Sequence, residues 1–162
     1  EIERVMNINF WGTLYMVKAF LPLLLKRPEA NITNVSSMGG FLPVPGQTLY
    51  GASKAAVKLF TEGLNSELHD TNVHVTIVFP GAIGTNIAAN SGVTNLGASA
   101  ESPKIKMTAV DVAGAAIVEG IEKNAYRVLI GSDAKMMDFL YRLMPKRAAR
   151  IIFEQMKSIL PK

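Results

Sequence analysis

The run of residues 73–79 (VHVTIVF) constrains the fold more than any other part of the sequence, because it is almost entirely apolar and rich in β-branched side chains. This composition predicts a β-strand. A strand without polar alternation is typical of a parallel sheet that is covered on both faces. Helical patterns lie before and after the run, so the strands are expected to be joined by right-handed crossovers. The run therefore predicts an α/β fold.

The rest of the chain alternates helices and strands. Apolar periodicity predicts helices over about residues 2–26 and 48–70, and β-branched residues predict strands over 31–36 and 127–130. Thr108 and Asp111 resemble a capping box that opens a helix to about residue 123, and two further helices divide near Pro145. On the helix 48–70 the expected apolar stripe is Leu49, Ala52, Ala56, Phe60, Leu64 and Leu68.

These elements predict a three-layer, Rossmann-like, doubly wound parallel sheet that is incomplete, with about three strands flanked by helices. The chain opens inside a helical pattern without an N-cap, and three strands are few for such a sheet. We therefore expect the chain to be the later part of a larger fold.

Composition and charge exclude several function classes. The 162 residues contain no cysteine, which excludes disulfides, thiolate metal sites and a thiol nucleophile, and we expect no metal site. The net charge of +4 arises entirely in residues 133–162, with 7 basic and 3 acidic side chains, while residues 1–132 carry 10 of each. A nucleic-acid-binding domain would carry its excess charge across the folded body, so no nucleic-acid partner is expected. We expect a cytoplasmic protein, because neither a targeting signal nor a membrane span is recognisable.

Polar side chains gather around two predicted strand ends. Tyr50 and Lys54 are four residues apart on a predicted helix, so both project from one face, where an ammonium favours a phenolate. By itself such a pair is more often part of a solvated helix surface. Ser37 follows one predicted strand, however, and the run 80–85 (PGAIGT) follows the next. Ligands of parallel sheets bind beyond the carboxyl ends of the strands, so these groups are expected to line one crevice.

Asn9 adds an amide to an otherwise apolar helix, where it is unfavourable without a specific partner. Together with Ser37, Tyr50 in the sequence YGASK, Lys54 and the run 80–85, it makes residues 2–130 resemble the short-chain dehydrogenase/reductase family. The spacings of 28, 13 and 4 residues between the four polar positions are similar to those of the family. The resemblance implies hydride transfer between a nicotinamide cofactor and a small-molecule alcohol/carbonyl substrate.

The resemblance also implies a role for each residue. Tyr50 would be the general acid in reduction and the general base in oxidation, and Lys54 would favour its ionised form and hold the nicotinamide ribose. Ser37 would orient the substrate oxygen, and Asn9 would position a water in a proton relay to Lys54. The expected cofactor is NADP or NAD, with NADP slightly favoured. Its expected binding residues are Tyr50, Lys54, Pro80, Gly81, Ile83 (through its backbone) and Thr85.

One family feature is missing, namely the glycine-rich turn after the first strand that holds the pyrophosphate. We therefore expect residues 1–132 to be the later half of the catalytic domain, truncated and inactive by itself. The alternative is a non-catalytic remnant that acts as a dimerisation or membrane-associated module.

Two segments remain. Residues 86–108 are expected to form a substrate loop, whose few charges suit a moderately apolar substrate. Residues 133–162 form a basic amphipathic helical extension that serves either as a packing or subunit contact or as a peripheral membrane contact. By analogy with the family, the protein is expected to be a homodimer or homotetramer.

Overall fold

The computed structural model describes residues 1–86 and 107–157, and within them lies a three-strand parallel sheet. Its strands are β1 (Ala30–Val35), β2 (Val73–Pro80) and β3 (Arg127–Ile130), in the order β1-β2-β3. Val35 pairs with Val78, and Phe79 pairs with Leu129, so the carboxyl ends of all three strands lie at one edge. The predicted fold class is confirmed: a Rossmann-like parallel sheet flanked by helices.

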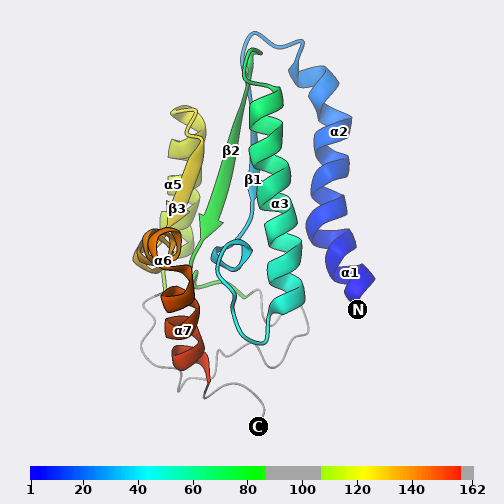
Figure 1. The fold of residues 1–162 in the computed structure, drawn as a ribbon. Coiled ribbons are helices and arrows are strands. Elements are labelled where there is room, and N and C mark those ends of the chain that lie inside the picture. Colours follow the sequence, from blue (N-terminus) through cyan, green and yellow to red (C-terminus); the bar gives the residue numbers. More distant parts are fainter. Residues whose placement is uncertain (87–106, 158–162) are drawn as a thin grey trace.

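Helices cover both faces of the sheet (Figure 1). The first helix runs without a break through α1 (Ile2–Met6), a π-helical segment η1 (Asn7–Trp11) and α2 (Gly12–Leu24). It packs beside α3 (Thr48–Glu67) on one face, and α5 (Val110–Glu122) covers the other. A short 3-10 turn, η2 (Met38–Gly40), follows β1. The chain continues after β3 into α6 (Ser132–Leu143) and α7 (Pro145–Met156).

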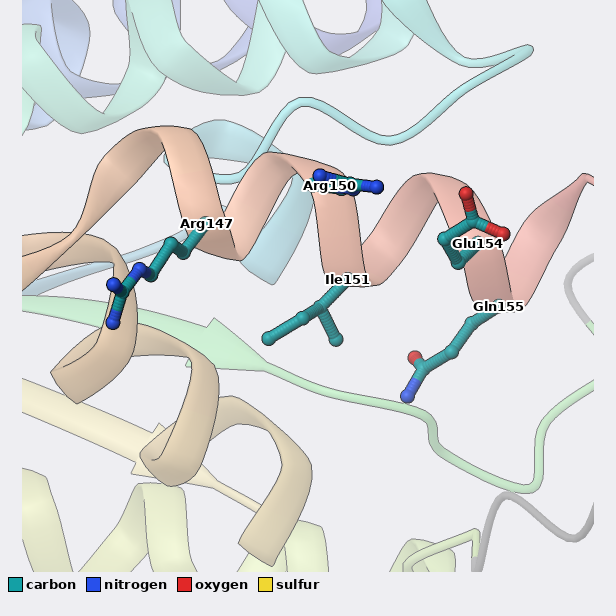
Figure 2. A pocket seen from close by; sticks show the side chains of 5 residues that line it. All are labelled: Arg147, Arg150, Ile151, Glu154 and Gln155. Carbon is teal, nitrogen blue, oxygen red and sulfur yellow. The ribbon is translucent and has the colours of Figure 1, made fainter.

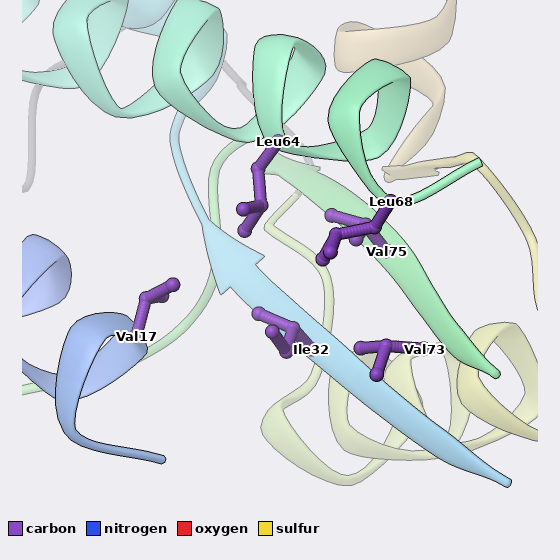
Figure 3. Close-up of a cluster of buried hydrophobic side chains, with 6 residues drawn as sticks. All are labelled: Val17, Ile32, Leu64, Leu68, Val73 and Val75. Atoms are coloured by element: carbon purple, nitrogen blue, oxygen red, sulfur yellow. The ribbon is translucent and has the colours of Figure 1, made fainter. Parts of the chain in front are cut away.

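The core divides between these two faces, because the side chains of a strand alternate in direction. On the α3 face, six apolar side chains from two helices and two strands form one buried cluster (Figure 3). These are Val17, Ile32, Leu64, Leu68, Val73 and Val75. On the α5 face, Val78 packs with Ala113 and Ile130. Burial on both sides explains why β2 reads as one continuous apolar run.

The predicted stripe on α3 is wrong in part. The buried residues of the helix are Ser53, Val57, Thr61 and Leu64, whereas Ala52 is exposed. Polar side chains can occupy the buried face because each has a partner. Asn34 Nδ2 donates to Thr61 Oγ1 at 3.0 Å, and that hydroxyl donates to the Val57 carbonyl at 2.7 Å.

The predicted capping box is also wrong. α5 begins at Val110 with Ala109 as its N-cap, while Thr108 forms an isolated parallel bridge with Ile83. The backbone of Thr108 is therefore used to hold the segment after β2. The expected substrate loop, residues 86–108, falls almost entirely outside the described residues.

Candidate active site

The ends of β1 and β2 bring the predicted site residues to one edge of the sheet. The Ser36 amide donates to the Val78 carbonyl at 2.9 Å, which continues the strand pairing to the residue before Ser37. Ser37 then leaves β1 directly beside the segment Pro80–Thr85, which leaves β2. α3 runs antiparallel to both strands, so its first turns, which carry Tyr50 and Lys54, lie over the same edge (Figure 1).

Ser37 and Tyr50 lie on the same side of this edge. Both flank Gly39: the position that a Cβ on Gly39 would take lies 3.6 Å from Ser37 Oγ and 3.6 Å from Tyr50 Cε1. Ser37 Oγ also accepts the Gly39 amide at 3.1 Å, which orients its side chain. The hydroxyl and the phenol ring are thus brought together from two segments, as the sequence predicts.

Lys54 is held at the end of β1. Its Nζ donates to the Val35 carbonyl at 3.1 Å and lies 6.0 Å from the centroid of the Tyr50 ring. Burial lowers the pKa of Lys54 from its ordinary value. The side chain therefore places a partly desolvated ammonium close to the phenol.

Asn9 contacts the residue before Lys54 rather than Lys54 itself. Its Nδ2 donates to Ser53 Oγ at 2.9 Å, and Ser53 Oγ donates to the Tyr50 carbonyl at 2.7 Å. Asn9 lies in the π-helical segment η1, a rare conformation that is common at functional sites. This chain of bonds ties the first helix to the turn of α3 that carries Tyr50.

Ser53 and Ser36 are two residues of the site to which sequence reasoning did not assign a role. Ser53 is fully buried, and its only sequence signal is its position three residues after Tyr50. Ser36 Oγ donates to the Lys54 carbonyl at 2.8 Å and so joins β1 to α3. The contact requires a glycine at position 40, because a Cβ there would lie 2.5 Å from Ser36 Oγ and 2.9 Å from the Lys54 oxygen.

The segment after β2 is fixed by backbone bonds. The Gly81 amide donates to the Ile130 carbonyl at 2.9 Å. Thr108 pairs with the same segment twice: its amide donates to the Ala82 carbonyl at 2.8 Å, and its carbonyl accepts the Gly84 amide at 3.0 Å. Ile83 thus lies between two fixed positions, and Thr85 follows it in an exposed position.

Comparison with known proteins identifies the family. The family model described as "short chain dehydrogenase" matches residues 1–95. This chain belongs to the short chain dehydrogenase family. The family predicted from Asn9, Ser37, Tyr50, Lys54 and the segment 80–85 is thereby confirmed.

Individual members of the family align with most of the chain. The Mycobacterium tuberculosis protein SadH, named as an oxidoreductase, is 34% identical over 168 residues, which cover 99% of this chain and 61% of SadH. The 3-ketodihydrosphingosine reductase of Bacteroides thetaiotaomicron is 38% identical over 96 residues, 59% of this chain and 36% of that protein. The crystal structure of a short chain dehydrogenase from Burkholderia cenocepacia in complex with NADP superposes with a TM-score of 0.78 at 28% identity, covering 94% of this chain and 60% of that one. The chain thus spans about 60% of the length of SadH and of the Burkholderia cenocepacia protein.

In this member of the short chain dehydrogenase family, α6 and α7 support the segment between Ser37 and Tyr50. Leu42 is buried against Met137, Ala148 and Ile152 of the two helices. Their apolar faces therefore cover the stretch of chain that positions the Ser37 hydroxyl.

A separate open groove of about 500 Å³ runs along α7 (Figure 2). It is lined by Arg147, Arg150, Ile151, Glu154 and Gln155, and none of the predicted site residues contributes to it. Residues 1–86 and 107–157 contain no cluster of three His, Cys, Asp or Glu side chains suited to a metal ion. No helix in these two ranges is both long and apolar enough to cross a bilayer.

Proposed function

We propose that this chain forms the substrate-binding and nicotinamide-binding part of an oxidoreductase that interconverts an alcohol and a carbonyl compound. The observation that carries the proposal is the convergence of three groups at one edge of the sheet. Ser37 Oγ and the Tyr50 ring both flank Gly39, and the Lys54 ammonium lies 6.0 Å from the centroid of that ring. A hydroxyl, a phenol and an ammonium in this arrangement suit proton transfer to a carbonyl oxygen.

The proposed chemistry uses the chain's own residues for the proton. In reduction, the Tyr50 hydroxyl gives its proton to the substrate oxygen, and in oxidation the Tyr50 oxygen takes the proton back. Ser37 donates a hydrogen bond to the same oxygen and so fixes the substrate. The Lys54 ammonium stabilises the negative charge on the Tyr50 oxygen once its proton has left. Asn9 acts through Ser53, by holding the first turns of α3 in place.

The residues after β2 fit the nicotinamide end of a dinucleotide cofactor. Ile83 offers a backbone amide between two anchored positions, and its carbonyl accepts the Thr85 amide at 2.8 Å. Thr85 offers an exposed hydroxyl, and Pro80 and Gly81 set the direction of the turn. When bound, the nicotinamide ring supplies or accepts the hydride. We propose NADP or NAD as the cofactor, with NADP slightly favoured, because the Burkholderia cenocepacia structure is a complex with NADP and the similar structure from Burkholderia phymatum is a complex with NAD.

We further propose that residues 1–132 are the later half of the catalytic domain and that residues 86–108 contact a moderately apolar substrate. The relative from Bacteroides thetaiotaomicron is named for the reduction of a keto compound, which supports a ketone as the substrate. Residues 133–162 are proposed to be an extension, of which α6 and α7 cover the segment after Ser37.

The test is reduction of a panel of apolar ketones by the protein at its natural length, followed through NADPH consumption. Removal of a general acid costs on the order of a hundredfold or more in rate, so we expect Tyr50→Phe to lose activity to that extent. The matched control is Tyr126→Phe, at an exposed tyrosine outside the site. Wild-type activity in Tyr50→Phe would contradict the proposed function, and an inactive wild-type protein would favour a non-catalytic role.

We propose that the exposed face of the first helix and α3 is a subunit interface in a homodimer or homotetramer. Trp11 stacks on Tyr15 with ring centroids 5.9 Å apart, Tyr15 is 62% exposed, and Leu59 on α3 is 70% exposed. Large aromatic and aliphatic groups gathered on neighbouring helices are typical of protein interfaces. Light scattering should give a lower mass for Leu59→Glu than for the wild type, and an unchanged mass would contradict this interface.

We also propose a cytoplasmic protein that contacts anionic membranes through α6 and α7. Phe139 and Leu143, on one side of α6, are 68% and 62% exposed, and Arg147 and Arg150 line the same groove on α7 as Ile151 (Figure 2). Apolar side chains among cations are typical of interfacial helices. Vesicles containing phosphatidylserine should sediment the wild-type protein, whereas Phe139→Ser combined with Leu143→Ser should remain in solution. Equal sedimentation of both proteins would contradict the contact.

A further inference from the structure

Asp133 connects α6 to the segment proposed to hold the nicotinamide. It is the second residue of α6, and its Oδ2 accepts the Ala82 amide at 2.7 Å, although the two residues are 51 positions apart. Ala82 precedes Ile83, whose backbone is proposed to contact the cofactor. The carboxylate is therefore one residue away from a proposed binding group.

Two glycines make room for this carboxylate. A Cβ on Gly81 or on Gly131 would collide with the Asp133 oxygens. Gly131 also has a φ of +95°, a conformation that residues with a Cβ rarely adopt. The carboxylate of Asp133 thus fills a slot that is closed by backbone on two sides and cannot easily turn away from Ala82.

The other oxygen of this side chain is unusual. Asp133 Oδ1 is buried and has no hydrogen-bond partner among residues 1–86 and 107–157. Burying a carboxylate oxygen without a partner is unfavourable. The side chain is retained in an unfavourable position, and its one described bond is to the segment after β2.

The bond to Asp133 completes the anchoring of that segment. The Gly81 amide donates to the Ile130 carbonyl, the Thr108 amide donates to the Ala82 carbonyl, and the Gly84 amide donates to the Thr108 carbonyl. Asp133 binds the Ala82 amide, and within residues 1–86 and 107–157 it is the only side chain that holds this segment by a hydrogen bond. It is also the anchor that a single substitution can remove without changing the backbone.

We propose that Asp133 is a positioning residue that holds the segment Pro80–Thr85 in the conformation that receives the nicotinamide end of the cofactor. This inference rests on the proposed function, because it assigns that segment to the cofactor. Asp133, a residue of α6, would then affect the binding of one end of the cofactor and not the other. Asp133 should influence binding of the nicotinamide end and leave binding of the adenosine end unchanged.

The experiment compares two ligands by calorimetry with the protein at its natural length. NADPH contains the nicotinamide, and 2′-phospho-ADP-ribose lacks it. A hydrogen bond to a charged group is worth enough to change an affinity by about tenfold, so Asp133→Ala should weaken NADPH binding by about that factor. Binding of 2′-phospho-ADP-ribose should stay within about twofold of wild type, because the segment does not contact that ligand.

Two further variants complete the design. Asp133→Asn keeps an oxygen acceptor of the same shape, so it should recover part of the NADPH affinity, and it provides a second test if Asp133→Ala does not fold. Asp111→Ala is the matched control, because Asp111 is the second residue of α5 and is exposed. It removes the same charge from the same helical position and should bind both ligands like the wild type.

The outcomes separate this inference from the proposed function. If the wild-type protein binds NADPH and Asp133→Ala binds both ligands as tightly, Asp133 does not position the segment. If Asp133→Ala weakens both ligands equally, its role is general stability and the inference is overturned. If the wild-type protein binds neither ligand, the proposed function itself fails.

Discussion

The charge of Arg127 is balanced by a carboxylate that is itself largely buried, that of Asp138. Its guanidinium lies over the Phe79 ring, 4.4 Å from the ring centroid, and over Phe41 at 5.8 Å. Its Nη2 donates to Asp138 Oδ1 at 2.5 Å, and the two side chains are only 17% and 10% exposed. Burial lowers the pKa of Arg127, and the charge of Asp138 opposes that change. The pair therefore joins β3 to α6, the helix that carries Asp133.

We expect Asp138→Leu to leave this cation buried without an anion. Two charges about 4 Å apart attract each other by about 4 kcal/mol at an effective dielectric constant of about 20. Breaking a buried pair from one side costs about 3–5 kcal/mol, so the free energy of unfolding should fall by about 3 kcal/mol. Replacing both partners, Arg127→Met with Asp138→Leu, should restore stability to within about 1 kcal/mol of wild type, because no charge is then left buried.

Urea unfolding at neutral pH of the protein at its natural length measures these differences. Arg142→Gln is the control, because the Arg142 Nε lies 3.1 Å from the same carboxylate but its side chain is 57% exposed. It should cost less than about 1 kcal/mol. The reasoning is refuted if the double variant is as unstable as Asp138→Leu, because the loss would then come from packing rather than from an uncompensated charge.

Three further predictions concern single positions. Because burial lowers the pKa of Lys54, the folded protein binds this proton less tightly than the unfolded chain, and stability should rise as pH increases from the folded pKa towards the ordinary value of 10.5. Lys54→Met should lack this part of the rise in urea unfolding at several pH values, and an identical rise in both proteins would contradict it. Gly40→Ala should lower the Tm because its Cβ would lie 2.9 Å from the Lys54 carbonyl oxygen. Gly63→Ala, with no atom within 4 Å of the new Cβ, should add about 0.5–1 kcal/mol of stability, and the same change in both alanine variants would refute the steric argument. Leu64→Ala should cost about 2–5 kcal/mol in urea unfolding, because Leu64 is buried in the core under α3. The equivalent change at Leu143, which is 62% exposed and lies outside the proposed subunit interface, should cost less than about 0.5 kcal/mol, so equal losses would show that burial does not set the cost.

Much of the fold follows from local patterns. The apolar run at β2 predicted a strand covered on both faces, and the structure covers it with α3 on one side and α5 on the other. The capping box at Thr108 failed because a local pattern cannot show that the backbone of Thr108 pairs with Ile83, 25 positions earlier. The apolar stripe on α3 failed for a related reason. Thr61 is buried because Asn34 supplies its hydrogen bond, and hydrophobicity alone does not report such a partner.

The candidate site, like the fold, could be predicted from the sequence only in part. Sequence spacing alone places Tyr50 and Lys54 on one helical face, because four residues make about one helical turn. Strand order then implies that Ser37 and the segment Pro80–Thr85 share an edge. The contact of Asn9 with Ser53, in contrast, depends on how the first helix lies beside α3. Spacing within one element cannot supply that information.

Sequence therefore determined the elements, their order and the chemical groups available, because periodicity and residue type act over a few neighbouring positions. Only the tertiary structure decided that Ser36 bonds to the Lys54 carbonyl and that Asp133 bonds to the Ala82 amide. These bonds join residues 18 and 51 positions apart. They form only after the sheet and its helices have packed, since packing alone sets the distance and direction between two separate segments.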